Sequence, residues 1–131
     1  MKIMQKQKRK AFQTEYEIKS SPGILFNFLS TSSGLSQWFA DEVDINDNDC
    51  SFAWNGEEQK AQIIERVEND FIRYKWLSGV EGEYFEFKIE KAEVTGDTIL
   101  IITDFADEKD IADQKMLWDS QVKTLMQQIG S

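Results

Sequence analysis

Histidine is absent from this sequence of 131 residues, and cysteine occurs once, as Cys50. Structural zinc sites are built mainly from several Cys and His ligands, so this composition excludes such a site. It also excludes the Ser–His and Cys–His pairs of nucleophilic catalysis. Cys50 has no partner for an intrachain disulfide, and its neighbours Asp49 and Ser51 offer no positive charge to stabilise a thiolate. We therefore interpret Cys50 as an inert thiol.

Loops that bind phosphate or calcium are also missing. The segment 79–82 begins and ends with glycine, but it carries Glu81, whose charge would repel a phosphate. Asp44, Asp47 and Asp49 lack the glycine and the terminal glutamate of a calcium loop, and we interpret them as part of a solvated turn. The sequence therefore predicts no catalytic residue, no metal ligand and no cofactor, and it leans away from an enzyme.

Long apolar runs and linker-like segments are absent as well. No apolar run approaches the roughly 18 residues of a membrane-spanning helix, and the basic segment 1–10 is followed by no apolar signal region. We therefore expect a cytoplasmic protein that does not insert into membranes. No segment rich in proline, serine and glycine divides the chain. We predict a basic, poorly ordered arm at 1–10 and a single domain at 11–131.

The charge is distributed unevenly along the chain. The net charge is −9, yet the first ten residues contain five cations and no acidic residue. The remaining residues therefore carry ten cations against 24 acidic residues, a formal charge of −14. Such an acidic body repels a phosphate backbone, so we expect no binding to nucleic acid.

The chain does contain clear periodic patterns. Alternation of apolar and polar residues predicts strands at 11–20, 42–45, 50–54, 58–67, 72–76 and 83–94, and a continuous apolar run predicts another at 99–102. Apolar spacing and capping residues predict short helices at 22–29 and 33–39, and a long helix at 107–129. The long helix carries one largely apolar stripe of Ile111, Lys115, Trp118, Val122, Leu125 and Ile129. An α+β fold, in which an antiparallel sheet covers this stripe, is the simplest arrangement.

The segment 99–102 is apolar on both faces of its strand. We expect the long helix to cover one face and a loop or a second subunit to cover the other. A homodimer is therefore a hypothesis of the sequence.

Five short motifs complete the sequence pattern. They are LSQWFAD at 35–41, FAW at 52–54 with Gly56, IRYKWL at 72–77, TDFA at 103–106 and LWD at 117–119. In this order the chain after residue 10 resembles the START-like superfamily, also called SRPBCC or helix-grip. It is most similar there to uncharacterised bacterial START-like proteins, and it is also similar to activators of a heat-shock-protein ATPase. Where many activator-like members carry a histidine, this chain has Asp104, so we infer no inherited acid–base role.

The resemblance implies a strand, two short helices, a six-strand antiparallel meander and a C-terminal helix packed on the curved sheet. In that fold the space between sheet and helix is often a cavity. The predicted ligand-binding residues are Phe26, Leu29, Trp54, Tyr74, Trp76, Phe85, Phe87, Trp118 and Val122. Large side chains could equally fill this space, and both alternatives stay open. If the space is a cavity, we expect Tyr74 to be its polar group.

Three functions are compatible with this pattern. The first is binding of a hydrophobic small molecule in the cavity. The second is a protein-interaction module similar to the chaperone activators, with a chaperone as partner and an interface formed by the acidic outer face and by Leu100 and Ile102. A cyclase-like enzyme ranks third. Asp104 is the carboxylate to watch because burial would raise its pKa, although it could simply accept hydrogen bonds at the end of a strand.

Overall fold

A computed structural model describes residues 9–130 of the chain. Its strands are β1 (Arg9–Ile18), β2 (Glu42–Asn46), β3 (Asp49–Trp54), β4 (Glu57–Val67), β5 (Phe71–Trp76), β6 (Phe85–Lys91) and β7 (Thr98–Asp107). Its helices are α1 (Pro22–Ser30), α2 (Ser32–Leu35), the 3-10 turn η1 (Glu108–Asp110) and α3 (Ile111–Ile129). The predicted α+β order of one strand, two short helices, six strands and a long helix is confirmed.

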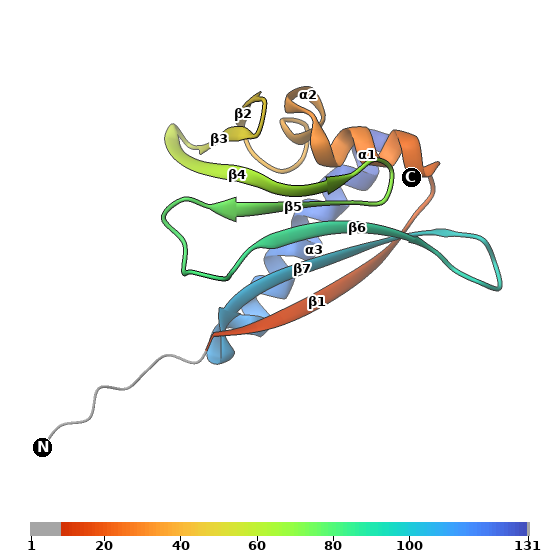
Figure 1. Cartoon of the computed structure of the whole chain (residues 1–131). Helices are drawn as coiled ribbons and strands as arrows, with labels where there is room; N and C mark the ends of the chain where they lie inside the picture. Colours follow the sequence, from red (N-terminus) through yellow and green to blue (C-terminus); the bar gives the residue numbers. More distant parts are fainter. Residues whose placement is uncertain (1–8, 131) are drawn as a thin grey trace, which may run out of the picture.

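The seven strands form one antiparallel sheet in the order β1-β7-β6-β5-β4-β3-β2. Strands β2 to β7 follow one another as a meander, and β1 joins the sheet beside β7. Helix α3 crosses one face of the sheet, and α1 and α2 lie toward its β2 edge (Figure 1). Alternation along each strand places one set of side chains under these helices and the other set on the opposite, outer face.

Local signals explain where the elements begin and end. The Ser21 side chain caps α1 by accepting a hydrogen bond from the backbone N–H of Ile24, and Pro22 occupies the first turn. Asn55 and Gly56 both adopt positive φ, as the tight turn between β3 and β4 requires. At the end of α3, Gly130 takes the left-handed conformation that stops the helix.

The core is built largely from aromatic rings. Phe52, Tyr74, Phe85 and Phe87 are almost completely buried on the inner face of the sheet. The rings of Tyr74 and Phe85 stack with their centroids 4.9 Å apart, and Phe87 meets Trp118 of α3 edge to face at 5.8 Å. These rings occupy much of the space between sheet and helix, which the family resemblance predicted as a cavity.

The residues that cover the two faces of segment 99–102 differ from the prediction. Leu100 and Ile102 are fully buried under the helices, so the expectation that they form an interaction surface is wrong. Ile99 and Ile101 point to the outer face, where they are only half-buried. Their register places charged residues of β1 and β6 beside them, namely Glu15, Glu17, Lys88 and Glu90. The aliphatic stems of these long side chains can cover apolar neighbours without a further loop.

Several boundaries differ from the prediction; the long helix α3, for example, begins at Ile111 rather than at residue 107. Arg9 and Lys10, which were assigned to the basic arm, belong to β1, and residues 1–8 of that arm lie outside the described residues. Strand β7 runs on to Asp107 because the residues after Thr103 still pair with β1. Helix α2 ends at Leu35 rather than at residue 39. In the described part of the chain, no helix is long and apolar enough to span a membrane.

Candidate functional site

The candidate site arises because β7 continues where its pairing with β6 stops. The last register pair of β6 and β7 is Glu86 with Thr103, whereas β1 remains paired with β7 as far as Asp107. Segment 104–107 therefore has β1 on one side and the loop 77–84 on the other. The loop leaves a gap at this end of the sheet, and the first half of α3 lies over the inner side of that gap.

One part of the gap is an aromatic pocket of about 360 Å³. Its lining residues come from the sheet, from α3 and from the segment after α2: Phe39, Trp54, Gln59, Trp76, Phe85, Asp104, Gln114, Leu117, Trp118 and Gln121. We call this the aromatic compartment. Trp54 and Trp76 form its half-buried rim, with ring centroids 6.2 Å apart. Phe85 and Trp118 are buried at its base.

The polar tips of the rings are held by specific partners. The indole N–H of Trp54 donates to the Phe39 carbonyl at 2.8 Å, and the side-chain amide of Gln121 donates to the same oxygen at 2.9 Å. The indole N–H of Trp118 donates to Oδ2 of Asp104 at 3.0 Å. These bonds fix the orientation of two of the indoles, so the walls of the compartment are largely preformed.

A second pocket of about 410 Å³ lies next to the first and shares Trp76, Asp104 and Gln114 with it. The remaining residues of its lining are Arg9, Ser78, Gly79, Val80, Glu83, Tyr84, Phe105, Ala106, Asp107 and Asp110. We call this the acidic compartment, because its lining contains four carboxylates and one guanidinium, a formal charge of −3. We refer to these two adjoining compartments together as the groove.

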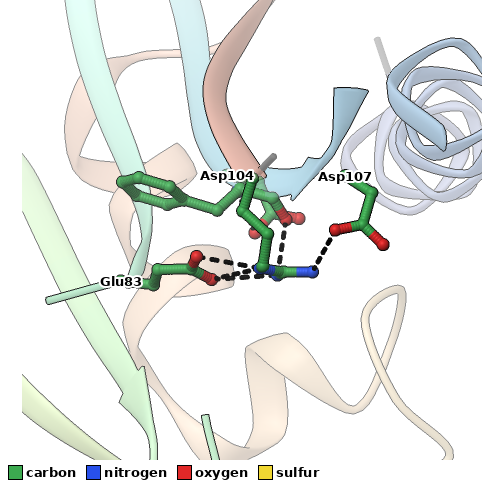
Figure 2. Close-up of polar contacts among 5 residues, drawn as sticks. Glu83, Asp104 and Asp107 are labelled. Carbon is green, nitrogen blue, oxygen red and sulfur yellow. Dashed lines mark hydrogen bonds and ion pairs between the residues drawn. The ribbon is translucent and has the colours of Figure 1, made fainter. Parts of the chain in front are cut away.

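Arg9 links the loop 77–84 to the sheet through Glu83 and Asp107, two of the carboxylates labelled in Figure 2. Its Nε lies 2.8 Å from Oε2 of Glu83, and its Nη2 lies 2.9 Å from Oε1, which makes a two-point ion pair. Nη2 also donates to the carbonyl of Phe105 at 3.3 Å, and Nη1 lies 3.7 Å from Asp107. The single cation of the groove lining is therefore already engaged with carboxylates.

Asp104 is the carboxylate that both compartments share. Burial raises its pKa above the ordinary value of an aspartate, and the negative charge of Glu83 raises it further. Hydrogen bonds from the Phe105 backbone and Trp118, together with the positive charge of Arg9, act in the opposite direction. A carboxylate has about four acceptor positions, and the two bonds from the chain, at 2.8 and 3.0 Å, leave capacity for a further donor.

Four of the nine predicted ligand-binding residues line the aromatic compartment: Trp54, Trp76, Phe85 and Trp118. The other five, Phe26, Leu29, Tyr74, Phe87 and Val122, lie in the buried core and line neither compartment. The Tyr74 hydroxyl donates to the Leu29 carbonyl at 2.6 Å, so its polar group points into the core rather than into the groove. Binding by the four groove residues stays a prediction.

Tyr74 belongs to a set of side chains that complete the end of α1. The last carbonyls of a helix lack partners within the helix. Here the Phe28 carbonyl accepts from the indole of Trp38 at 2.8 Å, and the Leu29 carbonyl accepts from Tyr74. The hydroxyls of Ser30 and Thr31 bind the carbonyls four residues before them. These contacts assign Tyr74 and Trp38 a role in holding α1 to the sheet.

Sequence reasoning missed several groove residues, among them Arg9, Phe39, Gln59, Gln114, Leu117 and Gln121. Gln114 and Gln121 were recognisable, because they stand four residues before and three residues after Trp118 and so share its side of α3. Arg9 carried no local signal, since its partner Glu83 is 74 residues away. Among the described residues no group of three potential ligands could hold a metal ion.

Comparison with known proteins places this fold in a family. Residues 4–131 match the model of the START-like superfamily domain. The chain belongs to this superfamily. The START-like chain is 38% identical to BfR322 from Bacteroides fragilis, a solution NMR structure, over 92% of this chain and 91% of that chain, with a TM-score of 0.67. No curated protein matches it.

More distant structures share the fold of this START-like domain. The Aha1 dimer from Colwellia psychrerythraea is 17% identical over 92% of this chain and 96% of that chain, with a TM-score of 0.76. A conserved protein of unknown function from Enterococcus faecalis, EF2215, is 22% identical over 91% of this chain and 70% of that chain, with a TM-score of 0.67. At these identities the likeness concerns the fold alone.

Proposed function

We propose that this START-like domain binds a hydrophobic small molecule in the groove, with the aromatic compartment as the principal contact surface. The observation that supports the proposal is a pocket of about 360 Å³ whose walls include Trp54, Trp76, Phe85 and Trp118. Small-molecule sites typically measure about 300–1,000 Å³ and combine apolar walls with a few polar groups. The proposed site lies at the open end of the sheet, because buried rings occupy much of the interior.

The polar groups of the compartment suit a flat ligand. The side chains of Gln59, Gln114 and Gln121 stand around the rings and can donate or accept hydrogen bonds. Ring faces favour a planar partner through stacking, which adds about 0.5–1.5 kcal/mol per ring pair to the effect of buried area. The proposed ligand class is therefore planar and largely apolar.

The chain contains an internal control for a binding experiment. Three of its four tryptophans, Trp54, Trp76 and Trp118, line the aromatic compartment, whereas Trp38 does not. In a two-dimensional NMR titration with a neutral planar probe such as naphthalene-2-methanol, we expect the indole N–H signals of the three groove tryptophans to shift. The Trp38 signal should stay in place. Equal shifts of all four signals, or none at millimolar probe, would count against the site.

Two adjacent residues of α3 provide a matched pair of variants. Leu117 lines the aromatic compartment and Met116 does not, and both are more than half exposed. Leu117→Ala should therefore weaken probe binding several-fold, since apolar contact area is lost. Met116→Ala should bind the probe as the wild type does. Both variants should keep the wild-type unfolding temperature in the absence of probe.

The alternative of a protein-interaction module has less support. Its predicted interface combined the acidic outer face with Leu100 and Ile102, and both of these residues are fully buried. The likeness to the Aha1 dimer concerns the fold alone.

A further inference from the structure

The groove joins an apolar half to a negatively charged half. The aromatic compartment contains no cation in its lining, and the acidic compartment contains four carboxylates with Arg9 as its one cation. Both compartments meet at Trp76, Asp104 and Gln114. A molecule that occupies both halves would therefore place its polar end beside carboxylates rather than beside cations.

We propose that the ligand is an organic cation, a planar apolar ring system that carries an ammonium group, with the ring in the aromatic compartment and the ammonium beside Asp104. This inference rests on the proposed function and specifies its ligand. An ammonium provides donors for the remaining acceptor positions of the Asp104 carboxylate. It would also lie near Trp76, and indole faces attract cations.

The electrostatics of the groove favour this ligand over a carboxylate or phosphate ester. Arg9, the cation that could attract an anion, is held by Glu83 through two contacts and lies near Asp107 as well. The N-terminus of α3 adds about half a positive charge near Asp110, which is small beside the formal charge of −3 of the acidic compartment. An anionic ligand would also have to lose its hydration next to the buried side of Asp104.

Asp104 is suited to such a partner by its surroundings. Burial raises the pKa of Asp104, which means that its charged form is poorly solvated in the free protein. A cation placed at hydrogen-bond distance would compensate this loss of solvation. Hydrogen bonds between charged groups are about twice as strong as neutral ones, so the charge of the ligand should dominate its selectivity.

Three probes that share one ring system test the inference on the wild-type domain. They are 2-naphthylmethylamine as the cation, naphthalene-2-methanol as the neutral analogue and 2-naphthoate as the anion. Titration calorimetry at low salt and neutral pH should give the tightest binding for the amine, about tenfold tighter than for the alcohol, and the weakest binding for the anion. The preference for the amine should shrink at 0.5 M salt because charge interactions are screened.

A pair of variants identifies the carboxylate. Asp104→Asn should reduce binding of the amine to the level of the alcohol and leave the alcohol unchanged. Glu17→Gln removes the same charge from the exposed outer face of β1 and should leave all three affinities as in the wild type. In the wild-type protein, the amine should also shift the ¹³C carboxyl signal of Asp104, and the alcohol should shift it much less.

The outcomes separate the two proposals. Equal binding of amine and alcohol, or tightest binding of the naphthoate, would overturn the organic-cation inference and leave the hydrophobic site in place. Failure of all three probes to bind would overturn the proposed function together with the inference. If Asp104→Asn did not fold, the ranking of the three probes and the Asp104 carboxyl signal would still decide the question on the wild-type chain.

Discussion

The Asp104 carboxylate accepts a hydrogen bond from the indole N–H of Trp118, with Oδ2 and Nε1 3.0 Å apart. This bond joins the last strand to the long helix at the point where the two compartments of the groove meet. The same side chain therefore contributes to packing and faces the groove. Both roles can be tested separately, because stability can be measured without a ligand.

The first prediction concerns the pH dependence of stability. Burial raises the pKa of folded Asp104, so the folded state holds its proton to higher pH than the unfolded chain does. The stability that this proton contributes is complete below the unfolded pKa of about 3.9 and is lost as pH rises through the folded pKa. Asp104→Asn does not titrate. The unfolding free energy of the wild type minus that of the variant should therefore decrease from about pH 3 to pH 7.

Urea unfolding followed by tryptophan fluorescence at several pH values would measure this difference. Glu17→Gln, on the exposed face of the sheet, serves as the reference for removal of one charge. A difference between wild type and Asp104→Asn that stays constant or increases with pH would show that Asp104 is not desolvated in solution.

The second prediction concerns the contact between α1 and α2. A Cβ atom at Gly34 would clash with the Asn27 carbonyl oxygen and would lie 2.7 Å from the Phe28 Cα. Both neighbours are backbone atoms, so the two helices would have to separate. We expect Gly34→Ala to lower the unfolding free energy by at least about 1 kcal/mol, within or above the typical cost of about 1–3 kcal/mol for overpacking.

Gly23, in the first turn of α1, is the matched control for this substitution. The nearest atom to a Cβ built there is the Asn69 side-chain oxygen at 3.9 Å, an ordinary contact. Gly23→Ala should therefore leave stability unchanged or raise it by up to about 1 kcal/mol, because alanine restricts the unfolded chain. Thermal unfolding of both variants would settle the comparison, and equal unfolding temperatures would contradict the predicted clash.

The third prediction assigns Tyr74 to packing. Tyr74→Phe removes the hydroxyl that donates to the Leu29 carbonyl at 2.6 Å and leaves a buried helix-end carbonyl without this donor. Such a loss costs about 1–3 kcal/mol. Affinity for naphthalene-2-methanol should stay at the wild-type level, because Tyr74 lines neither compartment. A variant of normal stability that no longer binds the probe would instead make Tyr74 a ligand contact.

Tyr74 also shows how far the sequence can be interpreted. Its alternation with Ile72 and Trp76 correctly predicts a strand with three large residues on the inner face. The direction of its hydroxyl depends on Leu29, which is 45 residues away, and period-two spacing carries no information about such a partner. Likewise, the apolar run 99–102 predicts burial, but only the register of β1 and β6 shows which charged residues stand beside Ile99 and Ile101.

Of the groove, only the aromatic compartment could be predicted from the sequence, because the acidic compartment depends on contacts between distant segments. Trp54, Trp76, Phe85 and Trp118 were recognisable from ring size and periodicity, and they do gather in one compartment. The acidic compartment depends on how many residues β7 extends beyond its last pair with β6. That difference in strand length is a property of the assembled sheet. Arg9 was therefore interpreted as part of a basic arm, although it pairs with Glu83.

The last prediction tests whether the Arg9–Glu83 ion pair holds the loop 77–84 over the acidic compartment. Glu83 is mostly buried and receives two contacts from the guanidinium, whereas Glu81, in the same loop, is 94% exposed where it pairs with Lys75. Glu83→Gln should therefore speed amide hydrogen exchange at Gly79 and at position 83, whose N–H groups donate to the Trp76 and Val80 carbonyls. Glu81→Gln should not, because exposed ion pairs contribute little. Equal exchange rates in the two variants would mean that the backbone turns alone hold the loop, and the acidic compartment would then owe its shape to the strand ends rather than to Arg9.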